Sequence, residues 1–215
     1  MGAFTGKTVL ILGGSRGIGA AMVRRFVTDG ANVRFTYAGS KDAAERLAQE
    51  TGAIAVFTDS ADRDAVIDVV RKSGALDILV VNAGIGVFGD ALELNADDID
   101  RLFKINIHAP YHASVEAARQ MPEGGRILII GSVNGDRMPV AGWLLMPPAN
   151  LPCKAWRAGW PVILDRVGSP STSSSQGQLI PTLIPPTGQC AICCIVLWLS
   201  KDMGNRKRSL VWSHG

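Results

Sequence analysis

Gly13-Gly14-Ser15-Arg16-Gly17-Ile18-Gly19 separates two segments of different hydrophobic periodicity. Residues 8–12 form a short β-rich apolar run typical of a buried strand, and residues 18–29 carry apolar side chains at helical spacing. Glycines between a strand and a helix allow a tight turn, and the helix offers free N–H groups to a pyrophosphate. We therefore interpret this stretch as a dinucleotide-binding turn; the alternative is a glycine turn with no ligand.

The same alternation of strand and helix continues to about residue 142. We expect strands at 8–12, 32–37, 54–58, 78–81 and 126–130, and helices at 18–29, 41–51, 62–73 and 97–120, the last bent at Pro110. Strict alternation indicates a parallel sheet covered on both faces. Right-handed crossovers make this an α/β fold with a Rossmann-like doubly wound parallel sheet, which we expect to be incomplete after the fifth strand.

The composition changes abruptly after Gly142. All five tryptophans and all four cysteines follow it, and the net charge changes from −2 for residues 1–142 to +5 for residues 143–215. We therefore divide the chain into a nucleotide-binding region (1–142) and an aberrant segment (143–215). The basic residues after Gly142 are scattered among Pro and Trp, so we expect neither a nucleic-acid polymer nor a membrane as partner.

Compartment and metal content are read from the cysteines and the start of the chain. Residues 1–142 contain no cysteine, which is typical of the reducing cytoplasm, and residues 1–7 contain no apolar signal segment. Cys190 and Cys193 form one C-x-x-C pair, and His108 and His112 lie at i,i+4. Both groups lack further ligands at metal-site spacing, so we expect no bound metal and a structural role for the histidines.

Several motifs resemble those of the short-chain dehydrogenase/reductase family. The glycine spacing is Gly-x-x-x-Gly-x-Gly, and Asn82-Ala83-Gly84 follows the fourth strand. Asn106 lies in the long helix and Ser132 follows the fifth strand. This ordered set extends from Lys7 to about Gly142. Members of the family are usually homo-oligomers, a property that is doubtful here because the aberrant segment replaces the expected interface.

Charge after the second strand favours NADP(H) over NAD(H). Residues 34–41 contain no acid that could bind a ribose hydroxyl, whereas cations and hydroxyls there suit a 2′-phosphate. The alternative is that these cations are merely solvated. By the resemblance, Asp59-Ser60 contacts the adenine. The candidate cofactor-binding residues are Gly13, Ser15, Arg16, Gly17, Ile18, Gly19, Arg34, Tyr37, Ala38, Ser40, Asp59, Ser60, Asn82, Ala83 and Gly84.

The resemblance implies a serine, a tyrosine, a lysine and an asparagine as catalytic groups. Ser132 and Asn106 match two of them; the alternatives are a polar strand end and a helix residue that satisfies backbone groups. The family places Tyr-x-x-x-Lys 13–14 residues after the serine, and no tyrosine or lysine stands there. The chain's two tyrosines, Tyr37 and Tyr111, lie elsewhere. The pKa of a free phenol is ~10, so a catalytic tyrosine needs an adjacent positive charge to act near neutral pH.

A shifted reading frame explains both the missing motif and the odd composition. Moving the codons of residues 145–150 back by one nucleotide can yield Tyr-Ala-Ala-Ser-Lys. The same shift through residues 175–181 can yield Pro-Gly-Pro-Ile-Asp-Thr, which resembles the family's Pro-Gly motif. We hypothesise a single-base deletion near codon 143.

Three functional hypotheses follow. The first is an NADP(H)-dependent oxidoreductase scaffold acting on a small-molecule carbonyl, impaired by the lost tyrosine and lysine. The second is a non-catalytic nucleotide-binding regulator, for which the resemblance implies a cyclic dinucleotide such as cyclic-di-GMP as ligand. The glycine turn would serve either hypothesis, because it recognises phosphate rather than a reaction. The third is an inert out-of-frame product.

Overall fold

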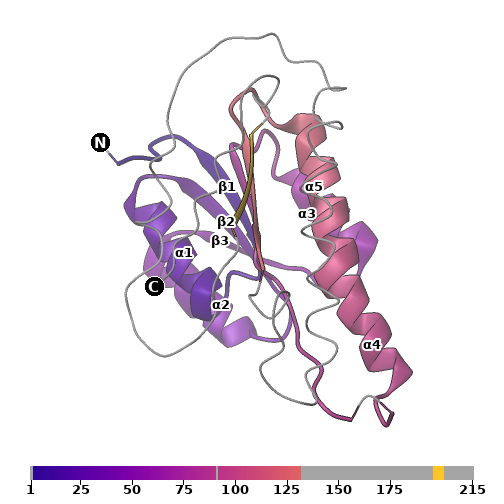
Figure 1. Cartoon of the computed structure of the whole chain (residues 1–215). Helices are drawn as coiled ribbons and strands as arrows, with labels where there is room; N and C mark the ends of the chain where they lie inside the picture. Colours follow the sequence, from indigo (N-terminus) through magenta and orange to yellow (C-terminus); the bar gives the residue numbers. More distant parts are fainter. Residues whose placement is uncertain (1, 91, 132–195, 201–215) are drawn as a thin grey trace, which may run out of the picture.

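The structure is a computed structural model of the chain that describes residues 2–90, 92–131 and 196–200 (Figure 1). Its sheet has the strand order β3-β2-β1-β4-β5-β6. The first five strands are parallel, and the order reverses direction at β1 and β4, as in doubly wound folds. The expected fold class is therefore confirmed. The strands are β1 (Thr8–Leu12), β2 (Asn32–Tyr37), β3 (Ile54–Phe57), β4 (Ile78–Val81), β5 (Arg126–Ile130) and β6 (Val196–Ser200).

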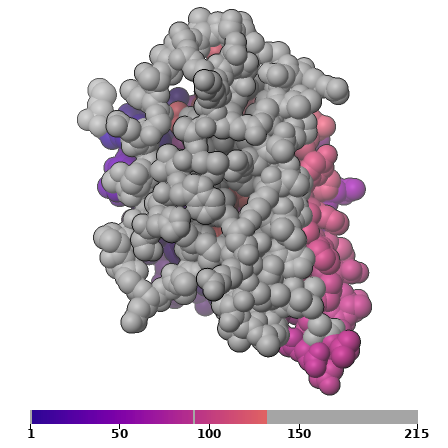
Figure 2. All heavy atoms as spheres, in the orientation of Figure 1, coloured from indigo at the N-terminus to yellow at the C-terminus, as the bar shows by residue number. Residues whose placement is uncertain are grey.

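Helices cover both faces of this sheet. On one face lie α1 (Gly17–Thr28) and α2 (Lys41–Thr51); on the other lie α3 (Arg63–Lys72) and α5 (Ala109–Gln120) (Figure 1). Helix α4 (Ala96–Phe103) leads through a π-helical turn (Lys104–His108) into α5. Together α4 and α5 form one flank of the molecule (Figure 2).

Strand β1 shows why the sheet needs both layers. Val9 and Ile11 are buried in the core against α1 and α2, whereas Leu10 and Leu12 are buried in the core against α3 and α5. Successive side chains of a strand point to opposite faces, so a strand that is apolar throughout requires cover on both sides.

The helix ends follow local capping chemistry. Asp62 precedes α3 and accepts hydrogen bonds from the N–H groups of Asp64 and Ala65, so the expected helix 62–73 begins at Arg63. Gly52 closes α2 with a left-handed φ of 74°. The expected helix 97–120 is instead divided by the π-helical turn before Pro110, because proline lacks the N–H that an α-helix requires.

A sixth strand lies at the edge of β5. We expected the sheet to be incomplete after the fifth strand; in the described residues, Val196–Ser200 pairs with β5 in antiparallel orientation, with Arg126 opposite Ser200 and Ile130 opposite Val196. A short apolar segment can satisfy the exposed N–H and C=O groups of an edge strand whatever its direction.

Candidate functional site

The glycine turn after β1 is fastened to β2. Gly13 donates its N–H to Thr36 Oγ1 at 2.9 Å, and the N–H of Gly14 donates to the Thr36 carbonyl at 2.9 Å. Gly13 has a φ of +77°, and a Cβ there would lie 2.7 Å from the Cα of Ala83. Only glycine fits both the conformation and the close approach.

Asn82 supports this turn from β4. Its Nδ2 donates to the carbonyl of Gly13 at 2.7 Å. A Cβ on Gly19 would lie 2.1 Å from that same carbonyl and 2.8 Å from Asn82 Nδ2, so α1 packs directly on the turn. Asn82 therefore holds the glycine turn in shape, and its expected cofactor contact stays a prediction.

The start of α1 is open to an anion. Gly17 has a φ of +52°, and among the described residues no neighbouring atom lies within 4 Å of the position of an added Cβ. Arg16 occupies the N-cap position without a side-chain cap bond, and the first turn of α1 contains no acidic residue. The free N–H groups and the positive end of the helix dipole can therefore serve a phosphate. Arg16, Gly17 and Ile18 are exposed and Ser15 is half-buried at this point.

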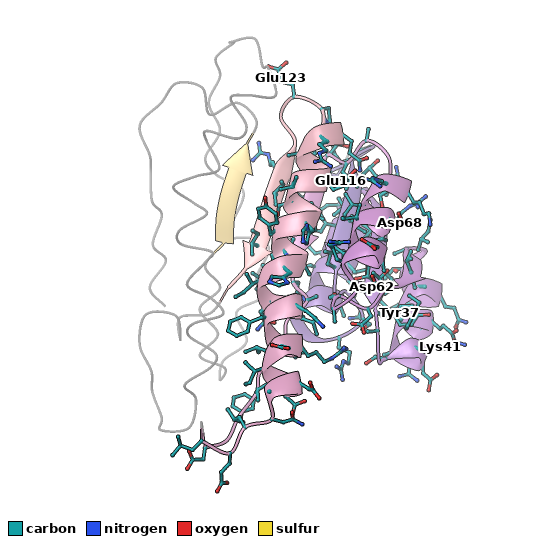
Figure 3. All side chains as sticks on the ribbon, turned by 90° about the vertical axis from the view of Figure 1, so that its right-hand side faces the viewer. Tyr37, Lys41, Asp62, Asp68, Glu116 and Glu123 are labelled. Atoms are coloured by element: carbon teal, nitrogen blue, oxygen red, sulfur yellow. The ribbon has the colours of Figure 1, made fainter. Side chains whose placement is uncertain are left out.

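The end of β2 lies at the same edge of the sheet, since parallel strands share their carboxyl edge. Tyr37 and Lys41 project there, while Glu123 lies at the opposite edge (Figure 3). The Tyr37 ring packs edge-to-face on Phe57 with centroids 5.8 Å apart. Ala38 is exposed and Ser40 is half-buried. Residues 34–41, which lead into this space, contain no acidic side chain.

Arg34 is not brought to this edge. Its Nη1 donates to the carbonyl of Lys72 at 3.2 Å. Lys72 ends α3, and that end lies at the amino edge of the sheet because α3 runs back from the end of β3. The cofactor role expected for Arg34 stays a prediction, and in this structure its side chain is held by Lys72, three residues before β2 ends. Arg16 and Lys41 remain as cations near the turn, with Lys41 Nζ 3.7 Å from Glu45 Oε1.

Asp59 follows β3 and is held by a residue that sequence reasoning missed. Nη2 of Arg101 lies 3.2 Å from Asp59 Oδ1 and 3.1 Å from Oδ2, and the N–H of Ala61 donates to Oδ1 at 2.9 Å. Ser60 is half-buried beside them. No sequence signal connects Asp59 with Arg101, because 42 residues separate them.

Asn106 lies in the π-helical turn and forms two hydrogen bonds with the loop after β4. Its Oδ1 accepts the N–H of Ile85 at 2.9 Å, and its Nδ2 donates to the carbonyl of Ile85 at 2.8 Å. The amide thus fixes the backbone directly after Gly84. Pro110 has no N–H, so the main-chain carbonyl of Asn106 lacks its α-helical donor.

Ser132 lies outside the described residues. The strand before it is placed, however: Ile129 of β5 pairs with Val81 of β4. The chain therefore leaves β5 beside Asn82-Ala83-Gly84. Residues 143–195, where the tyrosine and lysine are missing, also lie outside the described residues.

The two histidines lie away from the glycine turn, near α3. His112 is half-buried, and burial lowers its pKa, with the positive charges of Arg63 and His108 adding to the effect. It lines a shallow groove of about 430 Å³ between α3 and α5, together with Arg63, Asp64, Ile67, Asp68 and Arg71. Within residues 2–90 and 92–131, no group of three or more His, Cys, Asp and Glu side chains is arranged to hold a metal ion.

An ion-pair cluster joins α3 and α5 beside this groove. The buried carboxylate of Glu116 accepts from Arg71 Nε at 2.7 Å and from Arg119 Nη1 at 2.8 Å (Figure 3). The hydrogen bond from Arg71 holds the pKa of Glu116 below its usual value, and Arg119 adds to the effect. This cluster fixes α5, and with it the π-helical turn, against the rest of the fold.

Comparison with known proteins adds independent information. The family model described as "short chain dehydrogenase" matches residues 7–145. The "Cyclic-di-GMP-binding biofilm dispersal mediator protein" of Escherichia coli K12 is 97% identical over 142 residues, which is 66% of this chain and 60% of that protein. This chain thus spans well under two thirds of that relative.

Solved structures agree. The crystal structure of BdcA in complex with NADPH has 83% sequence identity and a TM-score of 0.76, with 78% of this chain and 68% of that chain covered. A short chain dehydrogenase from Burkholderia cenocepacia in complex with NADP has 40% identity and a TM-score of 0.73, with coverages of 77% and 71%. In the part of the chain that is described, no helix is both long and apolar enough to cross a membrane.

Proposed function

Because the chain belongs to the short-chain dehydrogenase family, we propose that residues 1–142 form an NADP(H)-binding oxidoreductase scaffold. The open start of α1 carries this proposal. It combines a left-handed glycine, an uncapped helix terminus and an exposed arginine at the point where a pyrophosphate would bind. The NADPH and NADP complexes of the two solved relatives support it.

The proposed residues fall into two groups. The first faces the ligand: Ser15, Arg16, Gly17 and Ile18 at the pyrophosphate, Tyr37, Ala38 and Ser40 at the 2′-phosphate, and Asp59 and Ser60 at the adenine. The second shapes the site: Gly13 and Gly19 through close packing, and Asn82, Ala83 and Gly84 beneath the turn. Without an acid after β2, nothing in the first group repels a 2′-phosphate except Asp59, which Arg101 neutralises.

We further propose that carbonyl reduction by this chain is impaired. When bound, the reduced nicotinamide supplies a hydride, and the substrate oxygen then needs a proton. Ser132 would orient that oxygen, and Asn106 would hold the loop beside it. No tyrosine or lysine follows Ser132 at the family's spacing, so the proton donor is absent.

A frameshift near codon 143 remains our proposal for the origin of this gap. Identity to the biofilm dispersal mediator is 97% over 142 residues, the same number of residues that precede the change in composition. Identity to the solved BdcA falls to 83% when the match extends to 78% of the chain, so the added positions contribute few identities. Sequencing the encoding DNA tests this: a one-base insertion there must restore both Tyr-x-x-x-Lys and Pro-Gly.

A second candidate function is binding of cyclic-di-GMP, favoured by the printed name of the relative that is 97% identical. The same phosphate-binding turn would serve a cyclic dinucleotide. Competition separates the two candidates: displacement of NADPH by cyclic-di-GMP would place both ligands at the turn after β1, and cyclic-di-GMP binding without displacement would place it elsewhere.

Titration with NADPH and NADH tests the cofactor proposal, with Ala38→Asp as the informative variant. A carboxylate at position 38 repels a 2′-phosphate and can bind a ribose hydroxyl, so we expect affinity for NADPH to fall by about tenfold or more and affinity for NADH to rise. Ala75→Asp is the control, because Ala75 is exposed before β4, at the opposite edge of the sheet. No NADPH binding by the wild-type chain, or equal effects of both variants, would refute the proposal.

A further inference from the structure

The contact between Arg101 and Asp59 joins two segments that the fold does not otherwise require to meet. Arg101 lies on α4, and Asp59 lies in the loop that leads from β3 to α3. Both side chains are partly exposed, at 49% and 37%, yet both carboxylate oxygens lie within 3.2 Å of Nη2. The Ala61 N–H completes the set by donating to Oδ1 at 2.9 Å. The carboxylate is therefore oriented from two sides.

The same contact extends toward the centre of the site. Five residues after Arg101, Asn106 binds both backbone groups of Ile85 through its amide. Ile85 follows Asn82-Ala83-Gly84, and Asn82 in turn binds Gly13. A continuous series of hydrogen bonds and covalent chain thus connects the loop after β3, the π-helical turn and the glycine turn.

The ion pair reduces the repulsion between Asp59 and a ligand that carries phosphates. NADP(H) would bring a pyrophosphate and a 2′-phosphate to this edge of the sheet, where Asp59 is the acid proposed to contact the adenine. An isolated carboxylate would repel these phosphates, whereas a carboxylate held by a guanidinium is nearly neutral to its surroundings and keeps a fixed orientation.

We propose that Arg101 is a positioning residue for the adenine end of NADP(H): it orients and neutralises Asp59 and so links the adenine loop to the helix that carries Asn106. This inference rests on the proposed cofactor binding. It assigns Arg101 no contact with the reacting atoms.

Arg101→Gln tests the proposal against a matched control, Arg24→Gln. Arg24 forms a surface ion pair of similar exposure with Glu50, at 2.7 and 2.8 Å, between α1 and α2. We expect Arg101→Gln to raise the Kd for NADPH, and for its adenine-containing fragment 2′,5′-ADP, by about five- to tenfold. Arg24→Gln should leave both unchanged, and Arg101→Lys should restore part of the affinity. Thermal unfolding is measured for each variant, and we expect similar small shifts in Tm for Arg101→Gln and Arg24→Gln.

A double-mutant cycle supplies the readout that a general structural role would not produce. In an Asp59→Asn background, Arg101→Gln should no longer change the affinity for 2′,5′-ADP, because its partner charge is gone. An undiminished effect there, or unchanged affinity of Arg101→Gln alone, would overturn the inference while leaving cofactor binding intact. Absence of NADPH binding by the wild-type chain would instead refute the proposed function, and the inference with it.

Discussion

The carboxyl ends of β1 and β5 lie in the same sheet, separated only by β4. The functional groups that follow the two strands differ. After β1, the glycine turn is fixed by Thr36 and Asn82 and opens on an uncapped helix. After β5, the sequence reaches Ser132 and then contains neither the tyrosine nor the lysine that the family's reaction requires. Every residue that shapes the first site precedes Gly142, whereas the second site depends on residues beyond it.

From this difference we expect cofactor binding and proton transfer to be separable in this fold. Phosphate recognition needs only a turn, a helix start and two supporting strands, all encoded within the first 84 residues. Proton transfer needs an acid of suitable pKa at one position, and the sequence has no tyrosine there. We therefore expect the chain to bind NADP(H) but to reduce carbonyl substrates slowly.

The largest effect is expected from repairing the frame. Inserting one base near codon 143 to restore Tyr-Ala-Ala-Ser-Lys should raise NADPH-dependent carbonyl reduction by about 10²- to 10⁴-fold, the usual contribution of a positioned general acid. NADPH oxidation with a panel of ketones and aldehydes measures it. The control is the repaired chain with its new tyrosine changed to phenylalanine: activity equal to that of the unmodified repaired chain would show that the tyrosine is not the acid.

Two glycine substitutions test whether the turn after β1 binds the pyrophosphate. Gly17 and Gly52 both have positive φ, at +52° and +74°, and in the described part of the chain nothing fills the space where a Cβ would go. Alanine at either position should cost about 1 kcal/mol of folding free energy. Only Gly17→Ala places a methyl group at the start of α1, so it alone should weaken NADPH binding, by about tenfold or more. Equal affinities of the two variants for NADPH in calorimetric titration would show that the pyrophosphate does not bind at this turn.

Glu116 tests how firmly α5 is anchored. Glu116→Gln should lower the free energy of unfolding by about 1–2 kcal/mol at pH 7, a modest value because Arg71 and Arg119 are exposed. The folded-state pKa of Glu116 is lowered, so its contribution is fully present above the unfolded pKa of about 4.3 and is lost as pH falls through the folded pKa. Denaturant unfolding at pH 7 and pH 3 measures both values. A difference at pH 3 as large as that at pH 7 would contradict this, with Glu123→Gln on the exposed turn before β5 as control.

The smallest effect is expected at His112. Its folded-state pKa is lowered by burial, so the unfolded chain binds the proton more tightly. Stability should fall as pH drops through about 6.5, by less than about 1 kcal/mol in total. His112→Gln should reduce this slope between pH 7 and pH 5. An unchanged slope for His112→Gln would show that the ring is not held neutral.

Much of this fold could be predicted because its signals are local. The buried runs of β1 and β4, the glycine after β1 and Gly52 at the end of α2 each identify an element from adjacent residues. What the sequence did not reveal are contacts between residues that lie far apart in the chain. Arg34 lies in a strand near the expected phosphate, but its side chain reaches the end of α3, 38 residues away. Arg101 reaches Asp59 across 42 residues, and β6 reaches β5 from the far end of the chain.

One paired measurement tests the central claim most directly: the Kd for NADPH by fluorescence titration and the rate of NADPH oxidation with carbonyl substrates, on the same preparation of the full chain. The account predicts saturable binding that Gly17→Ala weakens, together with turnover at least about 10²-fold below that of the frame-repaired chain. Turnover equal to that of the repaired chain, or no NADPH binding at all, would contradict it.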